Sequence, residues 1–205
     1  MSRYTGPKAR INRRLGAMIF ESAGAVRAFE KRPKPPGMAP PPRKLSTYGE
    51  ALREKQKIKY YYGMGERTLR RIYQEAQRSP GNTGQNLLLF CERRLDSVVR
   101  LAGLTKSRPQ ARQGVGHGHF LVNGRKTDIP SMLLRAGDIV HVKRQPHLTQ
   151  MYGGMANEYN EYAGRVPDWL TLDLEQLQVT VARLPSLDEI TLPVNVGIVI
   201  ELLSR

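Results

Sequence analysis

The sequence predicts an α+β fold in which helices come first and a small, mostly antiparallel sheet follows. Apolar residues recur at helical spacing from Ser46 to about Ala102. After Phe120 the pattern changes to short apolar runs separated by turn signals. The segment before Ser46 is basic and rich in proline, so it cannot bury a core of its own. We therefore expect a basic N-terminal arm (residues 1–45), a helical domain (46–93), a helix–helix–hairpin module (94–157), and acidic strands (158–205) that pack on the preceding domains.

Charge is distributed unevenly along the 205 residues, whose formal net charge is +15. Residues 1–150 carry 30 basic and 10 acidic side chains, whereas residues 151–205 carry 3 and 8. A field this basic favours a polyanionic partner, and nucleic acid is the commonest one. The acidic end is better suited to packing against protein.

Composition excludes several classes of protein. No apolar run approaches the roughly 18–20 residues that cross a bilayer, and the polar, basic N-terminus lacks the apolar stretch of a secretory leader. The single cysteine, Cys91, excludes an intrachain disulfide framework and a multi-thiolate zinc site, and it fits a reducing compartment. We expect no membrane association, no cofactor, no metal and no small-molecule substrate.

The first 45 residues have the character of a basic arm. Six of the 14 residues from Lys31 to Lys44 are prolines, which favour extended backbone. A short helix between about Ile11 and Phe29 would be interrupted by Gly16 and Gly24. Such an arm is expected to be disordered in isolation and to become ordered against RNA phosphates.

Three helices are expected next. Ser46 or Thr47 caps the first, which ends at Gly63. The second runs from about Glu66 and must end before Pro80. Its buried stripe comprises Leu69, Ile72, Tyr73 and Ala76. The third begins at Asn82 and contains the apolar run from Leu87 to Cys91.

Two short helices and a hairpin follow. The first helix starts near Arg94, and the second has Ser107 as its N-cap and Pro109 in its first turn. Arg108 and Arg112 are four residues apart, so they share one face of the second helix. Asn123-Gly124 predicts a two-residue hairpin turn, and further strands are expected at Ile139–Val142, over Trp169–Val181, and in the apolar run Ile198–Leu203.

Signatures of catalysis are scarce, and we expect no enzyme. There is no Walker-type loop and no HExxH helix, and the glycines of GVGHGH (residues 114–119) follow a helix where a dinucleotide loop would follow a strand. His117 and His119 could chelate a metal, but no third ligand is near, so contact with phosphate or solvent fits them better. Cys91 fits a core position, and Asp188-Glu189 fits a solvated turn.

Several long motifs resemble a known family. The stretch RLDSVVRLAGLTKSRPQARQGVGHGHFLVNGRKTDIPSMLLRAGDIVHV (94–142) resembles the S-four (S4) RNA-binding domain. The flanking motifs SRYTGPKARINRRLG, YGEALREKQKIKYYYGMGERTLRRIYQEA, GNTGQNLLLFCERRLD and IVIELLSR resemble the bacterial ribosomal small-subunit S-four family. The resemblance covers nearly the whole chain.

The resemblance implies a ribonucleoprotein component: a structural, cytoplasmic protein of the small ribosomal subunit. Such a protein would be a primary 16S rRNA binder that nucleates ribosome assembly in the subunit body. It would contact other small-subunit proteins, above all ribosomal protein S-five, with which it would influence the accuracy of translation. Arg43 and Lys44 would lie where mRNA enters the subunit.

Carried over by position, the resemblance also implies a set of rRNA-binding residues. They are Arg3, Lys8, Arg10, Arg13, Arg14, Arg53, Lys55, Lys57, Lys59, Arg67, Arg70, Arg71, Arg94, Arg108, Arg112, Gln113, His117, Asn123, Gly124, Arg125 and Lys126. Asp96 is expected to be structural. Replacing both Arg108 and Arg112 with Ala is expected to weaken rRNA binding without unfolding the protein.

The chain departs from the family pattern at several points. The proline-rich Lys34–Pro42 replaces a loop that in relatives is glycine-rich or carries zinc-binding cysteines, so no zinc or iron–sulfur site is expected there. Gly114 and Gly116 stand where relatives commonly have bulkier residues, which predicts a looser loop. Leu187 replaces a usual arginine, and Val196-Gly197 replaces a usually polar pair.

Two other functions share these features. An RNA-modifying enzyme or a tyrosyl-tRNA synthetase can carry an S4 domain for targeting, but it needs a catalytic domain, and here only the short acidic segment 158–205 follows the module. A free assembly factor or translational regulator would use the same basic surface. Sedimentation with mature small subunits, as opposed to free or precursor fractions, distinguishes the ribosomal role.

Overall fold

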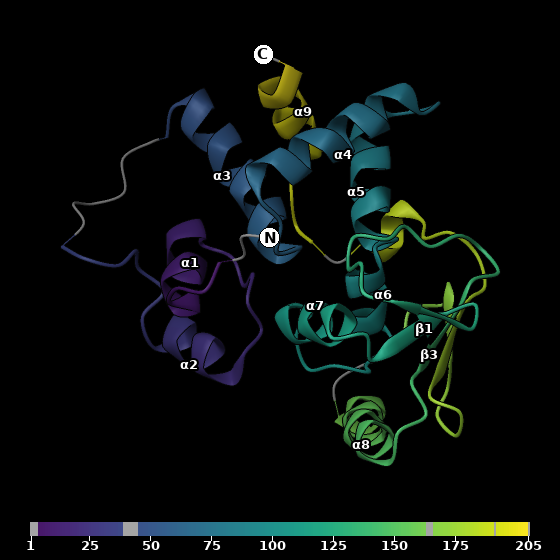
Figure 1. Cartoon of the computed structure of the whole chain (residues 1–205). Helices are drawn as coiled ribbons and strands as arrows, with labels where there is room; N and C mark the ends of the chain where they lie inside the picture. Colours follow the sequence, from purple (N-terminus) through teal and green to yellow (C-terminus); the bar gives the residue numbers. More distant parts are fainter. Residues whose placement is uncertain (1–3, 39–44, 163–165, 191, 205) are drawn as a thin grey trace. The chain divides into compact units, whose positions relative to one another are not determined.

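Within residues 4–38, 45–162, 166–190 and 192–204, which the computed structural model describes, helices come first and a sheet follows (Figure 1). This order confirms the predicted α+β class. The chain divides into two units: a helical unit of Met1–Leu87 with Thr191–Arg205, and a mixed unit of Leu88–Ile190. Among the described residues, no helix combines the length and apolar character needed to cross a membrane.

The basic N-terminal segment contains two short helices, α1 (Lys8–Leu15) and α2 (Ala23–Lys31). Helix α1 ends at Gly16, whose φ of 63° is the left-handed conformation that glycine adopts at little cost. The loop after it is fixed by the fully buried Asn12. Its amide donates to the carbonyl of Phe20 at 2.9 Å and accepts from the backbone N–H groups of Ile19 and Phe20. This part of the predicted arm therefore has a local core.

Helices α3 (Thr47–Tyr61) and α4 (Glu66–Arg78) match the predicted pair closely. The Ser46 hydroxyl accepts from the N–H of Gly49 at 3.2 Å, which confirms the predicted N-cap. All four residues of the predicted stripe on α4, from Leu69 to Ala76, are buried. Periodicity was sufficient here because each helix has one apolar face.

The C-terminal apolar run was wrongly predicted as a strand. It forms helix α9 (Val196–Ser204), which packs along α3 in the helical unit. Its approach is fixed by Glu54 of α3, whose carboxylate accepts from the backbone N–H of Asn195 at 2.9 Å. A short run of β-branched residues and leucines fits a strand or a helix equally well, and this contact between distant segments favours the helix.

The mixed unit follows helix α5 (Thr83–Glu92), which begins in the helical unit. It comprises α6 (Leu95–Leu101), α7 (Arg108–Gly116), β1 (Phe120–Val122), β2 (Arg125–Thr127), β3 (Ile139–Val142), α8 (Pro146–Tyr162), β4 (Leu170–Asp173), β5 (Gln178–Val181) and the 3-10 turn η1 (Leu187–Glu189). The strands form one antiparallel sheet in the order β2-β1-β3-β5-β4. Asn123 and Gly124 have φ values of 50° and 77° and pair Val122 with Arg125, which confirms the predicted hairpin turn.

Helix α8 was not predicted from the sequence. Its stretch contains Gly153-Gly154 and no strong apolar period, and both features argue against a helix on propensity alone. Burial of Leu148, Tyr152 and Ala156 in the core of the mixed unit compensates. Tertiary packing therefore decides this element.

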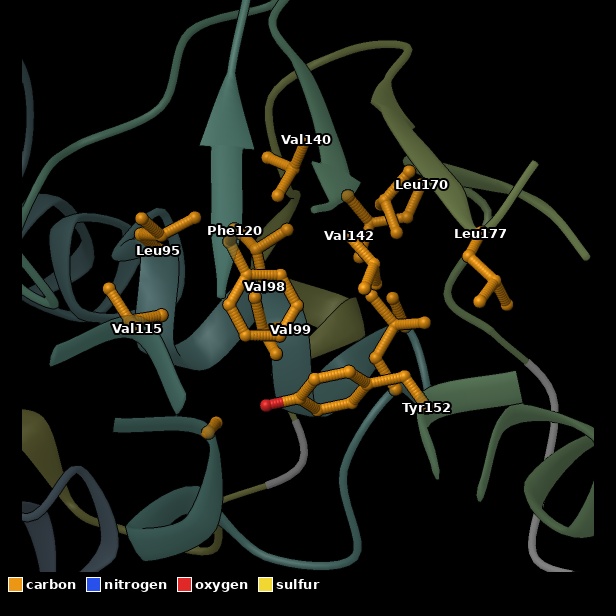
Figure 2. Packing of buried hydrophobic residues seen from close by; sticks show 14 of the residues in the cluster. Leu95, Val98, Val99, Val115, Phe120, Val140, Val142, Tyr152, Leu170 and Leu177 are labelled. Atoms are coloured by element: carbon orange, nitrogen blue, oxygen red, sulfur yellow. The ribbon is translucent and has the colours of Figure 1, made fainter. Parts of the chain in front are cut away.

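The core of the mixed unit lies between the sheet and helices α6, α7 and α8. Figure 2 shows Phe120 and Val140 from the sheet among Val98, Val99 and Tyr152 from the helices. Trp169, at the start of β4, is also buried, with 1% of its surface exposed. This core holds α7 and the β1–β2 hairpin in fixed positions.

Gly114 permits a close approach between α7 and α8. A Cβ added at this position would overlap the Tyr152 hydroxyl and would lie 3.2 Å from Cε2 of Phe120. The glycine predicted to loosen this loop is instead buried, and the space a larger residue would occupy is filled by Tyr152. The loop is therefore packed tightly at this point.

We expect Gly114→Ala to lower the free energy of unfolding by about 1–3 kcal/mol, because a well-packed core accepts an extra methyl only through strain. In the Tyr152→Phe background the overlapping oxygen is gone, so the same substitution should cost less than about 1 kcal/mol. Urea denaturation of the four proteins in this double-mutant cycle measures the coupling. Equal costs in both backgrounds would contradict the close approach.

Candidate nucleic-acid interface

The mixed unit presents exposed polar side chains on α7 and on the β1–β2 hairpin. Gln113 lies in the last turn of α7 and His117 follows the helix directly. Both side chains are exposed, and they are hydrogen-bonded to each other. Arg125 and Lys126 are exposed on edge strand β2. Strand β1 joins the hairpin to the core. Because β2 has no outer neighbour in the described sheet, Arg125 and Lys126 lie on the accessible edge of the sheet.

Asn123 has a structural role at the hairpin turn. Its amide donates to the Asp138 carboxylate at 2.9 Å and accepts from the N–H of Ile139 at 2.9 Å. The other Asp138 oxygen accepts from the N–H of Arg135 at 2.7 Å. Asn123, predicted as an RNA contact, thus ties the turn to the start of β3. Gly124 beside it is exposed.

Arg94, also predicted as an rRNA contact, is instead buried, with 1% of its surface exposed. Its Nε and Nη2 donate to the two carboxylate oxygens of Asp96 at 3.0 and 2.7 Å. A guanidinium held by a bidentate pair inside the protein is unavailable to a ligand, so the structure corrects this prediction. The expected structural role of Asp96 agrees with its burial.

Arg108 and Arg112 belong to the same charged cluster. Arg112 donates to Asp96 at 3.2 Å, and Arg108 lies 3.7 Å from the buried carboxylate of Glu92. The exposed fractions of the two arginine side chains are 12% and 13%. Removing both would leave two buried carboxylates short of positive charge. We therefore now expect the double Ala substitution to lower the stability of the fold as well as RNA binding.

We expect Arg94→Met to lower the free energy of unfolding by about 3–5 kcal/mol, because it leaves the buried Asp96 carboxylate without its bidentate partner. Urea denaturation provides the measurement. Arg125→Met, an exposed arginine given the same new side chain, serves as the control and should change the value by less than about 0.5 kcal/mol. Normal stability of Arg94→Met would contradict a structural role for this residue.

In the helical unit, Glu66 holds two lysines of α3 together. Its carboxylate accepts from Nζ of Lys55 at 2.7 Å and from Nζ of Lys59 at 3.2 Å. Lys57 is bonded in the same way to Glu54, at 2.6 Å. The three lysines predicted to meet RNA are thus anchored by carboxylates at the surface of the unit.

The exposed face of α4 carries three arginines that the family resemblance predicts as rRNA contacts. Arg67, Arg70 and Arg71 are all exposed, opposite the buried stripe. Arg70 and Arg71 lie 3.9 and 3.8 Å from the carboxylates of Glu66 and Glu75, which are weak surface pairs. Arg53 is exposed on α3. These cations remain accessible to an anionic ligand.

The pKa of Glu66 is lowered from its ordinary value of 4.5. Partial burial opposes ionisation, but the hydrogen bonds and charges of Lys55 and Lys59 outweigh it. Because the folded protein holds the proton less tightly than the unfolded chain, this pair stabilises the fold above pH 4.5 and loses its contribution as the pH falls through the lower folded value.

We expect the free energy of unfolding of Glu66→Gln to fall less than that of the wild type when the pH drops below 4.5. The variant lacks the carboxylate, so the contribution of the Glu66–lysine pairs is already absent at neutral pH. Free energies of unfolding measured from pH 7 to about pH 3 test this. Glu30→Gln, exposed on α2, provides a matched control. Parallel pH curves for wild type and Glu66→Gln would exclude the lysine pair as a source of acid sensitivity.

The predicted N-terminal cations have differing environments. Arg10 and Arg14 are exposed on α1, and Nζ of Lys8 lies 5.9 Å from the centre of the Phe20 ring. Arg13 has a structural contact, because its Nε donates to the carbonyl of Lys34 at 2.8 Å. This hydrogen bond holds the proline-rich segment against α1. Arg3, Arg43 and Lys44 lie outside the described residues.

Other candidates for chemistry prove to be structural. Burial raises the pKa of the Cys91 thiol to about 12, so it remains a neutral core group. Glu189 forms a capping box with Ser186 and accepts from Arg183 at 2.6 Å, as expected for a surface turn. In the described ranges, no three His, Cys, Asp or Glu side chains gather as metal ligands would.

Comparison with known proteins identifies relatives along the whole chain. The family described as Ribosomal protein S4/S9 N-terminal domain matches residues 3–92, and the S4 domain matches residues 93–140. A protein of Rhodopirellula baltica named Small ribosomal subunit protein uS4 is 55% identical over 100% of both chains. Proteins of the same name from Rubrobacter xylanophilus and Opitutus terrae are 46% and 44% identical, again over 100% of both chains.

Proposed function

Because this chain belongs to the uS4 family of ribosomal proteins, we propose that it is a structural, rRNA-binding constituent of the small ribosomal subunit. The observation that carries the proposal is the exposed basic hairpin of the S4 domain, held beside α7 by the core. A rigid edge bearing Arg125 and Lys126 can meet phosphates without an ordering cost for its backbone. The exposed arginines of α4 supply a second cationic surface on the helical unit.

We further propose that the RNA is 16S rRNA and that the chain binds it as a primary binder, nucleating assembly of the subunit body in the cytoplasm. Affinity comes mainly from neutralised phosphates and therefore falls with salt. Specificity comes from the shape of a folded junction, since the deep major groove of A-form RNA hides base edges from side chains.

The acidic end is proposed to face protein. Residues 151–205 carry 8 acidic and 3 basic side chains, which suits a basic neighbour, and we assign ribosomal protein S-five to that place. Through this contact the pair would influence translational accuracy. Arg43 and Lys44 are proposed to approach incoming mRNA.

Two alternatives are less well supported. A free assembly factor or regulator would share the basic surfaces, but relatives matching over the full length are named as subunit proteins. An enzyme is also less well supported, because the full-length relatives are named as subunit proteins and not as enzymes. The proposed role is therefore non-enzymatic.

We expect the double substitution Arg125→Gln and Lys126→Gln to weaken binding to a 5′-domain fragment of 16S rRNA by about tenfold at low salt. The slope of log affinity against log salt concentration should fall by about 1–2, because two phosphate contacts are lost. Filter binding over a salt series measures both quantities.

The matched control is Lys106→Gln with Arg183→Gln, which removes the same charge from the same unit. Both residues pair with carboxylates, Glu158 and Glu189, and neither belongs to the hairpin. An equal loss of affinity in the control would show that only net charge matters. Recovery of the wild-type protein solely in free or precursor fractions, and not in mature small subunits, would contradict the ribosomal role itself.

A further inference from the structure

A partly buried hydrogen bond joins His119, in the loop after α7, to Tyr152 of helix α8. Its Nδ1 lies 2.9 Å from the hydroxyl of Tyr152, and the two rings meet edge to face with centroids 6.0 Å apart. The Tyr152 ring also packs against Phe120, with centroids 5.0 Å apart. Figure 2 shows the Tyr152 hydroxyl extending away from Val142 and Leu177. The imidazole is therefore held on one side by a rigid partner.

The surroundings of the Tyr152 hydroxyl favour one tautomer of His119. Among the described residues, the Tyr152 hydroxyl has one hydrogen-bond partner, Nδ1 of His119. A buried hydroxyl needs an acceptor for its proton, so Tyr152 donates and Nδ1 accepts. The proton of the neutral imidazole is then on Nε2, which becomes a donor on the other side of the ring.

Both groups keep these protonation states at neutral pH. Burial raises the pKa of Tyr152 to about 12, so its hydroxyl remains protonated. Burial, followed by the charges of His117, His147 and Lys143, lowers the pKa of His119, so its ring remains neutral.

The surroundings of His119 are those of an anion-binding surface. The ring of the exposed His117 lies 5.5 Å away between centroids, and the exposed Lys143 donates its backbone N–H to the carbonyl of His119 at 2.7 Å. Lys126 packs its aliphatic chain across Gly118, on the other flank of His119. His117 and Lys143 are thus near enough to act on the charge of His119, and Lys126 lies across the neighbouring Gly118.

We propose that His119 is an RNA contact of the S4 domain, in which Nε2–H, fixed as a donor by Tyr152 at Nδ1, binds a phosphodiester oxygen of the rRNA. Tyr152 is then a positioning residue, and Gly114 leaves the space that its hydroxyl occupies. The inference rests on the proposed rRNA-binding function. A neutral donor of fixed orientation adds geometric selection to the sequence-independent attraction of the neighbouring lysines.

The tautomer is testable on the free protein. Nitrogen-15 NMR of the imidazole at pH 7.5 should show the His119 proton on Nε2 in the wild type. In Tyr152→Phe the proton should distribute between both nitrogens, and the His119 pKa should rise. A wild-type proton on Nδ1 would overturn the proposal whatever the RNA affinity.

The contact is testable with two amides of different reach. Gln places an N–H at the same point along the side chain as imidazole Nε2, whereas Asn ends at the position of Nδ1. With the 5′-domain fragment of 16S rRNA, we expect His119→Asn to bind about three- to tenfold more weakly and His119→Gln to stay within about twofold of wild type. Circular dichroism and thermal unfolding identify any variant that fails to fold. If His119→Asn does not fold, the affinity of His119→Gln is compared with that of the wild type alone.

The outcomes separate this inference from the proposed function. If the wild type binds and the hairpin double variant weakens binding, but His119→Asn and His119→Gln both bind like wild type, the His119 contact is overturned and the rRNA-binding role stands. Equal weakening by Asn and Gln would likewise overturn a specific role for Nε2–H. Absence of wild-type binding would overturn both.

Discussion

The mixed unit depends on the burial of one guanidinium. Arg94 has 1% of its surface exposed, and a charge in that position must be paired and hydrogen-bonded. Asp96 supplies both acceptors, which fixes the turn between α5 and α6. The adjacent backbone bonds residue by residue to the returning segment, since Leu95 N–H donates to Met132, Asp96 N–H to Pro130, and Leu134 N–H to Arg93. The segment after the hairpin is thereby tied to the start of α6.

This arrangement divides the basic residues into two classes. Arg94, Arg108 and Arg112 neutralise buried carboxylates, and Arg13 and the lysines of α3 are held by carbonyls or carboxylates at defined points. The hairpin residues Arg125 and Lys126 and the arginines of α4 are exposed. Net charge counts both classes alike, although only the second is exposed, and the pairs that Arg70 and Arg71 form with Glu66 and Glu75 are weak surface ones. The two classes explain why so basic a chain can still fold.

Much of the fold could be predicted locally. The Ser46 cap, the α4 stripe and the Asn123-Gly124 turn are each determined by a few neighbouring residues, and all three were confirmed. The local pattern does not predict helix α8 and favours a strand at α9, because in both cases packing against distant segments outweighs local propensity. For the candidate interface, sequence spacing correctly placed Arg108 and Arg112 on one face of α7, but could not show that this face meets Glu92 and Asp96.

The α+β order, the family, and the excess of positive charge that directs the first 150 residues toward a polyanion are all legible in the amino-acid sequence. These are properties of local patterns and of composition, which are present before folding. Which cations pair with buried carboxylates and which remain accessible depends on the folded structure. The structure also shows that Gly114 makes room for Tyr152 and that the Tyr152 hydroxyl lies 2.9 Å from Nδ1 of His119. Such roles depend on distances between residues far apart in the chain, and no local pattern contains those distances.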